Sequence, residues 1–555
     1  MGIPGDFERA QQLIQGADLA HPDGELLMSF LEDSVDNDQA ASYLLGVCDS
    51  SEDQISGLAI VLSQWKSLIA IFHTGFRAQM DDEKTIKSIR ARDNECFLTG
   101  TKGSWKDPLV VVEIFPSVSR KISGSLRDIF AAFFSQEHED YLESYTSALS
   151  HQQPLGSNLW LVRSSAADAF SQGFFQVEIR DGIAHIHITF VTMPEYPRII
   201  QQANTSRIIV LHKEATADFT FPDAISLDIL SRLAPSIRWT CIAKIVSPTS
   251  PSEEISTKPF MSQPYTWFSY MLDACGNCML ATWRILPTSF RIMMYRGLAY
   301  IGSRIYEPTN SFKVQRLPFG MYLKTSPNEW HTSLSNEFKT LDLLRRQTDT
   351  PVPKPLDIAS DDKSTYLITS RLPGKPIGMC MDYLNDEKLR AFTHDLRSCL
   401  KVMRDLQRDP TLQNMISNVS GDACYDGRIN AAVEYDETRG DFIGPFSRED
   451  EFNETLKNPQ IPEVIHRNGH KIVFTHGDIN LRNVLVDERS GRLSGIVDWE
   501  TAGWYPDYWE YTKAHYAIKF KWRWLKNVVG RGAFSDFGDF SEDLDIERKL
   551  WRYCW

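Results

Sequence analysis

The sequence predicts an α+β protein, with a mixed α and β region at its N-terminus and a two-lobed region at its C-terminus. Three observations support this fold class. A chain of 555 residues is too long for one hydrophobic core. Its clearest change of composition is at residues 247–264, where Ser, Pro and acidic residues predict a linker. Beyond it, strand periodicity gives way to helical periodicity. We therefore expect a domain at residues 1–246, and lobes at residues 265–370 (strand-rich) and 371–555 (helical).

The composition is that of a soluble globular protein, with 42% apolar and 24% charged residues. The net charge is −14 and no stripe of Lys and Arg stands out, so specific nucleic-acid binding is not expected. Such an acidic field favours a cationic small-molecule partner. No window of about 18 uncharged apolar residues is present, so we expect no membrane partner. The oligomeric state is left open.

Cysteine usage predicts a reducing compartment. The nine cysteines are odd in number and follow no framework spacing. The N-terminus also lacks a basic and apolar secretion signal, so we expect a cytoplasmic or, alternatively, nuclear protein. Cys275 and Cys278 form the only CxxC pair, which supplies two of the four ligands of a structural zinc site. We expect free thiols there and assign no metal.

The N-terminal region combines helical and strand periodicities. The expected helices and strands cover residues 57–76 and 126–147, and residues 174–178 and 183–190, respectively. His185 and His187 lie two positions apart in the last strand, hence on one face. Two imidazoles without a third ligand make an incomplete metal site, so we expect packing or surface histidines.

The first lobe of the C-terminal region has a strand, lysine, helix, glutamate order. Residues 313–324 predict two short strands joined by a turn at residues 318–320 and ending in Lys324. Residues 329–346 then show apolar residues every three or four positions, with Glu337 beside that stripe.

The second lobe begins after a bend in the chain. Residues 365–369 predict another strand, and residues 372–374 (Leu-Pro-Gly) predict the connector between the lobes. Residues 387–407 place apolar side chains at helical spacing, which predicts a long core helix.

A β-hairpin at residues 471–498 carries the polar groups that phosphoryl transfer needs. That chemistry requires a carboxylate that orients the acceptor, and ligands that hold Mg²⁺ against the nucleotide phosphates. Asp478, Asn483 and Asp498 supply two carboxylates and an amide, and oxygen ligands suit Mg²⁺.

The hairpin resembles a known family. His476 to Asn483 read HGDxxxxN, which has the spacing of the protein-kinase catalytic loop HRDxxxxN with Gly477 in place of the arginine. Asp498-Trp499-Glu500 stands where a protein kinase has DFG. These features resemble the aminoglycoside phosphotransferase and choline kinase family, especially its fungal members, and imply a bilobal protein-kinase-like fold.

The resemblance covers roughly residues 265–555 and implies roles for the hairpin residues. Asp478 would be the catalytic base, and His476 would brace its loop. Asn483 and Asp498 would bind Mg²⁺.

The resemblance also implies an ATP site in the first lobe. Lys324 would contact the nucleotide phosphates and pair with Glu337, and the nucleotide-covering turn would be residues 317–320, with Gly320 as its single glycine. Backbone N–H groups that approach phosphates usually need more glycine. We therefore expect an ATP- and Mg²⁺-dependent kinase of a small-molecule hydroxyl. The alternative is a catalytically weak or inactive kinase-like binding or scaffold protein. Neither the acceptor nor the choice of ATP over GTP is predicted.

The segment before the C-terminus is rich in carboxylates. Its acidic residues are Asp536, Asp539, Glu542, Asp543, Asp545 and Glu547. A solvated acidic face is the expected structure. A site that attracts an amine-bearing acceptor is the alternative.

Residues 85–190 resemble fungal HNH-endonuclease-like domains. The matching residues are Cys96, Thr99, Gly100, Ile114, Phe115, Pro116 and Asn158. Glu113 and Ala167 stand where that family has its two histidines. Because hydrolysis needs a histidine to activate water, we expect a degenerate domain without nuclease activity.

Overall fold

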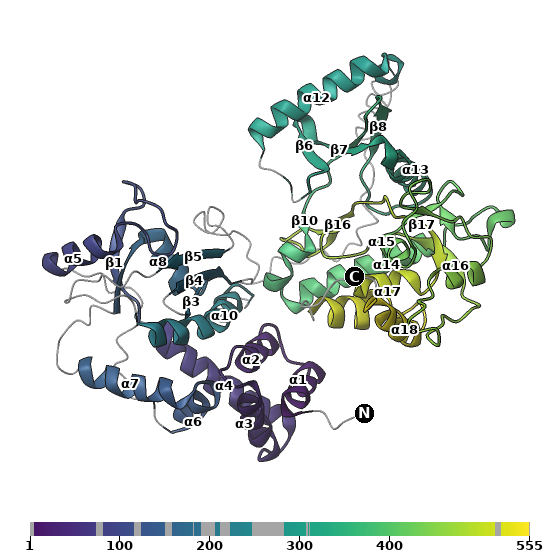
Figure 1. Cartoon of the computed structure of the whole chain (residues 1–555). Coiled ribbons are helices and arrows are strands. Elements are labelled where there is room, and N and C mark those ends of the chain that lie inside the picture. Colours follow the sequence, from purple (N-terminus) through teal and green to yellow (C-terminus); the bar gives the residue numbers. More distant parts are fainter. Residues whose placement is uncertain are drawn as a thin grey trace. The chain divides into compact units, whose positions relative to one another are not determined.

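Figure 1 shows the computed structural model of the chain, which contains two compact units, Met1–Pro251 and Ser252–Trp555. The structure describes residues 5–73, 82–115, 122, 124–149, 158–180, 183–189, 206–210, 223–246, 282–306, 309, 311–516 and 523–553. The predicted linker and the pair Cys275 and Cys278 lie outside these described residues. The domain boundaries expected from the sequence therefore stay predictions.

Helices enclose the core of the first unit. They are α1 (Asp6–Gly16), α2 (Asp23–Glu32), α3 (Asn37–Asp49), α4 (Gln54–His73), α5 (Glu83–Asp93), α6 (Ser125–Phe133), α7 (Gln136–Leu149), α8 (Ser164–Ser171) and α10 (Ala224–Val246). By length and composition alone α4 could cross a membrane. Its Trp65 and Phe72 are fully buried, however, and Trp65 packs against Phe30 and Phe133 with ring centroids 5.1 and 4.5 Å away. In this unit α4 is a core helix.

Two small antiparallel sheets complete the first unit. β1 (Leu109–Glu113) pairs with β2 (Leu159–Arg163), and β4 (Ile183–Ile188) lies between β3 (Phe175–Arg180) and β5 (Ser206–Val210). The strands expected here are present, whereas the single helix expected at residues 126–147 is divided into α6 and α7. The break is at Phe134, whose backbone is extended and whose ring is buried against Phe130.

His185 and His187 are half-exposed on one face of β4, with parallel rings whose centroids are 6.4 Å apart. Glu178 and Gln176 lie opposite them on β3. Within the described residues, no further His, Cys, Asp or Glu forms a metal-type group with this pair.

The first lobe of the second unit is an antiparallel sheet of four strands in the order β6-β7-β9-β8. Its elements are α12 (Thr288–Ile305), β6 (Val314–Leu317), β7 (Met321–Pro327), α13 (His331–Gln347), β8 (Pro355–Ser360) and β9 (Ser364–Ser370). α12 was not expected from the sequence; it lies along β6 and β8 (Figure 1). A Cβ on Gly302 of α12 would lie 2.3 Å from the carbonyl oxygen of Arg316, so glycine is required at this contact.

The second lobe is built around α14 (Asp386–Arg404), the long core helix that the sequence predicts. The other helical elements are α15 (Gly427–Asn430), α16 (Glu449–Thr455), α17 (Trp509–His515), η8 (Trp524–Ala533) and α18 (Ser541–Trp551). Short strands form three small sheets: β10 (Lys375–Pro376), β15 (Val484–Val486) and β16 (Leu493–Ile496); β11 (Ser417–Asn418), β17 (Gly503–Pro506) and β14 (Ile472–Thr475); β12 (Cys424–Tyr425) and β13 (Phe442–Ile443). The predicted hairpin is β15 and β16, and β14 pairs with β17 instead.

Candidate active site

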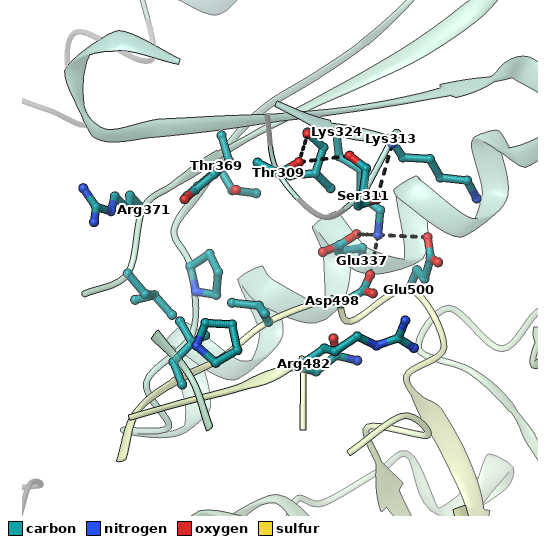
Figure 2. Close-up of a pocket in the computed structure, with 18 of the residues that line it drawn as sticks. Thr309, Ser311, Lys313, Lys324, Glu337, Thr369, Arg371, Arg482, Asp498 and Glu500 are labelled. Atoms are coloured by element: carbon teal, nitrogen blue, oxygen red, sulfur yellow. Dashed lines mark hydrogen bonds and ion pairs between the residues drawn. The ribbon is translucent and has the colours of Figure 1, made fainter. Parts of the chain in front are cut away.

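Lys324 lies within β7 and its side chain is buried. Its Nζ is 2.9 Å from Oε2 of Glu337, 2.5 Å from Oδ1 of Asp498 and 2.9 Å from Oε2 of Glu500 (Figure 2). Burial alone would lower the pKa of Lys324, but the three carboxylates outweigh it and raise that pKa well above its usual value. The structure thus brings together the lysine and glutamate that the sequence singled out, and adds Glu500.

Three carboxylates therefore surround one ammonium group. The oxygens of Glu337, Asp498 and Glu500 lie within 4.8 Å of one another. Burial raises the pKa of Glu337, and the neighbouring carboxylates raise it further against the effect of Lys324. The cluster carries more negative than positive charge, and its donors are oxygens of the kind that Mg²⁺ prefers. The residues present therefore fit a bound magnesium ion.

The turn after β14 depends on Gly477. Its φ is +80°, and an added Cβ would lie 2.9 Å from the carbonyl oxygen of Thr501. A side chain there would meet both a left-handed backbone and a fixed carbonyl group. This explains why glycine replaces the arginine of the protein-kinase pattern.

His476 is a fixed, neutral part of the same loop. Its Nδ1 accepts a hydrogen bond from the backbone N–H of Asp478 at 3.1 Å, which leaves Nε2 to donate to the carbonyl oxygen of Val497 at 3.0 Å. Burial lowers the pKa of His476 to about 4. Both ring nitrogens are therefore engaged with main-chain groups, which is the contact expected of a bracing residue, and the role itself stays a prediction.

Asp478 and Asn483 interact directly. Nδ2 of Asn483 donates to the Asp478 carboxylate at 2.7 Å and to its carbonyl oxygen at 2.9 Å. These bonds use the NH₂ of Asn483 and leave its amide oxygen for a ligand. Burial raises the pKa of Asp478, against the lowering effect of Lys513. The carboxylate is therefore a stronger base than an exposed aspartate.

Asp498 adopts a backbone conformation that is unusual for a residue with a side chain. Its φ is +68°, and it follows β16 directly before the fully buried Trp499. The indole Nε1 of Trp499 donates to the carbonyl oxygen of Ile496 at 2.9 Å, which fixes the turn. Left-handed strain of this kind is concentrated at functional sites. Here it accompanies a carboxylate that lies against Lys324.

Glu510 in α17 is a site residue that the sequence analysis missed. Its carboxylate accepts hydrogen bonds from the backbone N–H groups of His476 and Gly477, at 2.5 and 3.0 Å. Burial raises the pKa of Glu510 to about 7, against these hydrogen bonds. A glutamate more than thirty residues beyond the loop has no spacing rule that would mark it. Its role is to hold the start of the catalytic loop.

A cleft of about 920 Å³ lies beside these groups and is lined by both lobes. Lys324, Asn483 and Asp498 line it together, and Figure 2 shows Lys324 and Asp498 side by side there. Its apolar lining includes Val314, Leu367, Leu485 and Val497. The cleft therefore combines an apolar wall with a charged end.

The turn expected to cover the nucleotide, residues 317–320, lies outside the cleft lining and stays a prediction. Gly320 lies at the tip of the β6–β7 hairpin and does not line the cleft, because Leu317 already pairs with Met321 and leaves only three residues at that tip. Thr309 and residues 311–313, just before β6, line the cleft instead.

Two of the six carboxylates near the C-terminus are buried in ion pairs. Glu547 lies 2.7 Å from both Arg428 and His466, and Asp543 lies 2.6 Å from Arg467. The expected fully solvated acidic face is therefore wrong for this pair, because cations of the second lobe neutralise them. The exposed members are Asp536, Asp539, Glu542 and Asp545.

Comparison with known protein families gives a match within the second unit. The sequence model of the phosphotransferase enzyme family (APH) matches residues 310–531. This match covers Lys324, Glu337, Asp478, Asn483 and Asp498, and confirms the predicted phosphotransferase class for this part of the chain. The search of curated proteins found no match.

Several solved structures are similar to this chain. Aminoglycoside phosphotransferase APH(3'')-Id from Streptomyces rimosus, solved with ADP and streptomycin, is 18% identical over 48% of this chain and 98% of that chain, with a TM-score of 0.33. Aminoglycoside-3'-phosphotransferase of type VIII is 17% identical over 45% and 92% of the two chains, with a TM-score of 0.31. Macrolide 2'-phosphotransferase MphH from Brachybacterium faecium is 14% identical over 46% and 87%, with a TM-score of 0.26.

Proposed function

We propose that the second unit transfers the γ-phosphoryl group of ATP to a hydroxyl group of a small molecule, with Mg²⁺ as the metal. One observation carries this proposal: Lys324, Asn483 and Asp498 come from separate segments and line the same cleft. Phosphoryl transfer depends on positioning and on charge neutralisation, and these residues supply a cation and two oxygen ligands. The apolar wall of the cleft suits the planar purine base of ATP, which supports the proposal.

Asn483 and Asp498 would hold Mg²⁺, with Glu500 as a further carboxylate beside them. When bound, the ion neutralises the negative charge of the nucleotide phosphates. The excess of carboxylates over ammonium groups around Lys324 supports this assignment. Lys324 would contact the phosphates, and Glu337 would keep its amine in place.

Asp478 would take the proton of the acceptor hydroxyl as the acceptor oxygen bonds to the γ-phosphorus. The bond between that phosphorus and the bridging oxygen breaks, and ADP leaves with the bond's electron pair. The raised pKa of Asp478 supports this role, because a stronger base accepts the proton more readily. Asn483 fixes one oxygen of that carboxylate and His476 fixes its backbone.

The test measures ADP release by the purified protein with Mg-ATP and a panel of hydroxyl-bearing acceptors, together with Mg-ATP binding by titration calorimetry. We expect acceptor-dependent ADP release that is lost in Asp478→Asn while Mg-ATP binding is retained. Mg-ATP binding without turnover by any acceptor would favour the kinase-like binding or scaffold protein. Absence of Mg-ATP binding would refute the proposed nucleotide site.

The acceptor and the compartment are also proposals. The carboxylates around the cleft and the net charge of −14 support a cationic small-molecule acceptor. The six cysteines within the described residues are free thiols, which supports a cytoplasmic or nuclear location. The first point is tested by measuring how amine-bearing and neutral acceptors bind to the same preparation at rising salt concentrations. Salt should weaken the binding of the charged acceptors only.

We propose that the first unit keeps an HNH-like scaffold without its hydrolytic chemistry. β1 and β2 form an antiparallel pair, with α6 and α7 between them in the chain, and α8 follows β2. The Asn158 side chain accepts from the backbone N–H of Phe115 at 2.7 Å and donates to its carbonyl oxygen at 3.0 Å, so it holds the end of β1 near Glu113. Incubation of the full chain with DNA and divalent metals should give no cleavage, and metal-dependent cleavage would contradict this proposal.

A further inference from the structure

One face of α13 is tied to the second lobe by polar contacts. Ser333, Asn336 and Lys339 recur every third residue and therefore share this face. Ser333 Oγ donates to Oε2 of Glu500 at 3.1 Å, and Lys339 Nζ donates to Oγ of Ser420 at 2.9 Å. α13 is also the helix that carries Glu337. The contacts thus connect the glutamate's helix to the segment that follows Asp498.

Asn336 makes the densest set of these contacts. Its Nδ2 donates to the carbonyl oxygens of Glu500 at 3.1 Å and Ala502 at 2.8 Å, and its Oδ1 accepts from the backbone N–H of Val419 at 3.1 Å. The side chain is buried. Its NH₂ and its oxygen are both engaged, and every partner is a main-chain group of the second lobe. A single amide therefore joins three segments: α13, the chain after Asp498, and the chain after β11.

The site needs such a tie because its own charges oppose it. Glu337, Asp498 and Glu500 place carboxylate oxygens within 4.8 Å of one another around one ammonium group. Like charges at this distance repel, so Glu337 is pushed away from the cluster until a further cation enters. Outward movement of α13 would relieve the repulsion among these carboxylates and would separate Glu337 from Lys324.

We infer that Asn336 is a positioning residue that holds α13 against the second lobe, so that Glu337 stays paired with Lys324 before any nucleotide binds. The inference rests on the proposed function, because it assigns a purpose to the Lys324–Glu337 pair in phosphoryl transfer. Asn336 acts through Glu337 and contacts no reacting group. The arrangement would make the second unit ready for catalysis without a separate activation step.

The test compares Asn336→Ala with a matched control, Asn453→Ala, in the full chain. Asn453 is buried to a similar degree, at 4% exposure against 5%, and its Nδ2 also donates two hydrogen bonds, to the carbonyl oxygen of Arg467 and to Asn468. It lies in α16 and outside the cleft lining. We expect Asn336→Ala to lower kcat by about tenfold or more, with a change in KM for ATP of less than about threefold. Asn453→Ala should leave both constants within about twofold of wild type.

A double-substitution cycle separates positioning from general destabilisation. If Asn336 acts through Glu337, Asn336→Ala should reduce kcat little in a Glu337→Gln background, so the two effects are not additive. Additive effects, or equal losses in Asn336→Ala and Asn453→Ala, would overturn the inference.

Hydrogen–deuterium exchange of α13 gives a readout that needs no turnover. Without nucleotide, the backbone amides of His331–Gln347 should exchange faster in Asn336→Ala and at the wild-type rate in Asn453→Ala. Unchanged exchange in Asn336→Ala would overturn the inference. If the wild-type protein shows no turnover, the proposed function fails by itself, and this measurement still decides whether Asn336 holds the helix.

Discussion

Replacement of Glu510 by glutamine should change how the stability of the second unit depends on pH. Glu510 is buried between α17 and the catalytic loop, and its pKa rises from 4.5 to about 7 because burial disfavours the charged form. A group with a raised pKa in the folded state contributes stability that is fully present below its unfolded pKa. That contribution is lost as the pH rises through about 7. The rise from 4.5 to about 7 corresponds to about 3 kcal/mol.

The assay is urea-induced unfolding followed by tryptophan fluorescence at pH 5, 7 and 8.5, fitted as two transitions. The transition that responds to the substitution is assigned to the second unit. A glutamine cannot ionise, so the unfolding free energy of wild type minus that of Glu510→Gln should fall by about 3 kcal/mol between pH 5 and pH 8.5. Taking the difference cancels the contributions of the other titrating groups to the unfolding free energy. Glu463→Gln, at an exposed glutamate of the same lobe, controls for the loss of one carboxylate. A difference that does not vary with pH would refute the reasoning.

Three further predictions concern the same unit. Asp478→Asn should lower the rate of ADP release by about 100-fold to 10,000-fold, because the acceptor proton loses its base; wild-type rates in this variant would exclude that role. In wild type, the rate should fall as the pH is lowered, and the midpoint of this fall should lie above the pKa of an ordinary aspartate. Burial raises the pKa of Asp478, and only its ionised form accepts a proton. Gly477→Ala should destabilise the unit by about 1–3 kcal/mol, since it adds a Cβ 2.9 Å from the carbonyl oxygen of Thr501 at a φ of +80°; an unchanged melting temperature would contradict this. Glu547→Gln should cost about 3–5 kcal/mol at pH 7, because it removes the carboxylate from a fully buried ion pair with Arg428. Arg428 and His466 outweigh burial and lower the pKa of Glu547 to about 2, so its contribution is present above pH 4.5 and is lost as the pH falls towards 2. Urea unfolding at pH 7 and pH 3 checks both the size and the direction of this effect.

The site could be predicted from the sequence where its chemistry lies in short local patterns. Asp478 and Asn483 are five residues apart on one loop, and this spacing carries the family resemblance that implies their proposed roles. Lys324 and Glu337 follow from the order of a strand and an amphipathic helix. The structure places Lys324, Glu337 and Asn483 in the lining of one cleft together with Asp498, and Asp478 is hydrogen-bonded to Asn483.

Other residues of the site act through tertiary contacts that cannot be recognised from the spacing of residues along the sequence. Glu510 binds main-chain N–H groups of a loop more than thirty residues earlier, and Asn336 binds main-chain groups of two distant segments. Main-chain partners carry no residue type that a sequence pattern could match. Glu500 was visible only as a neighbour of Asp498, and its contact with Lys324 depends on the left-handed turn at Asp498.

The predicted nucleotide-covering turn at Gly320 rests on a different kind of pattern. Gly320 was the only glycine near Lys324, and glycine was taken as the mark of a phosphate-binding turn. The hairpin needs Gly320 for its own geometry, because its φ is +69°. The cleft-lining residues before β6 contain no glycine among those described, so composition could not identify them.

The hydrogen bond between Asn483 and Asp478 couples two tasks that are usually considered separately. The amide that would present its oxygen to the metal uses its NH₂ to hold the carboxylate that would receive the acceptor proton. In the proposed mechanism, a change in metal occupancy would therefore reach the base through the side chain of Asn483. Metal dependence and the acidic limb of the pH profile should then shift together in variants of Asn483. In the proposed mechanism, the base is correctly oriented only while the metal ligand is also in place.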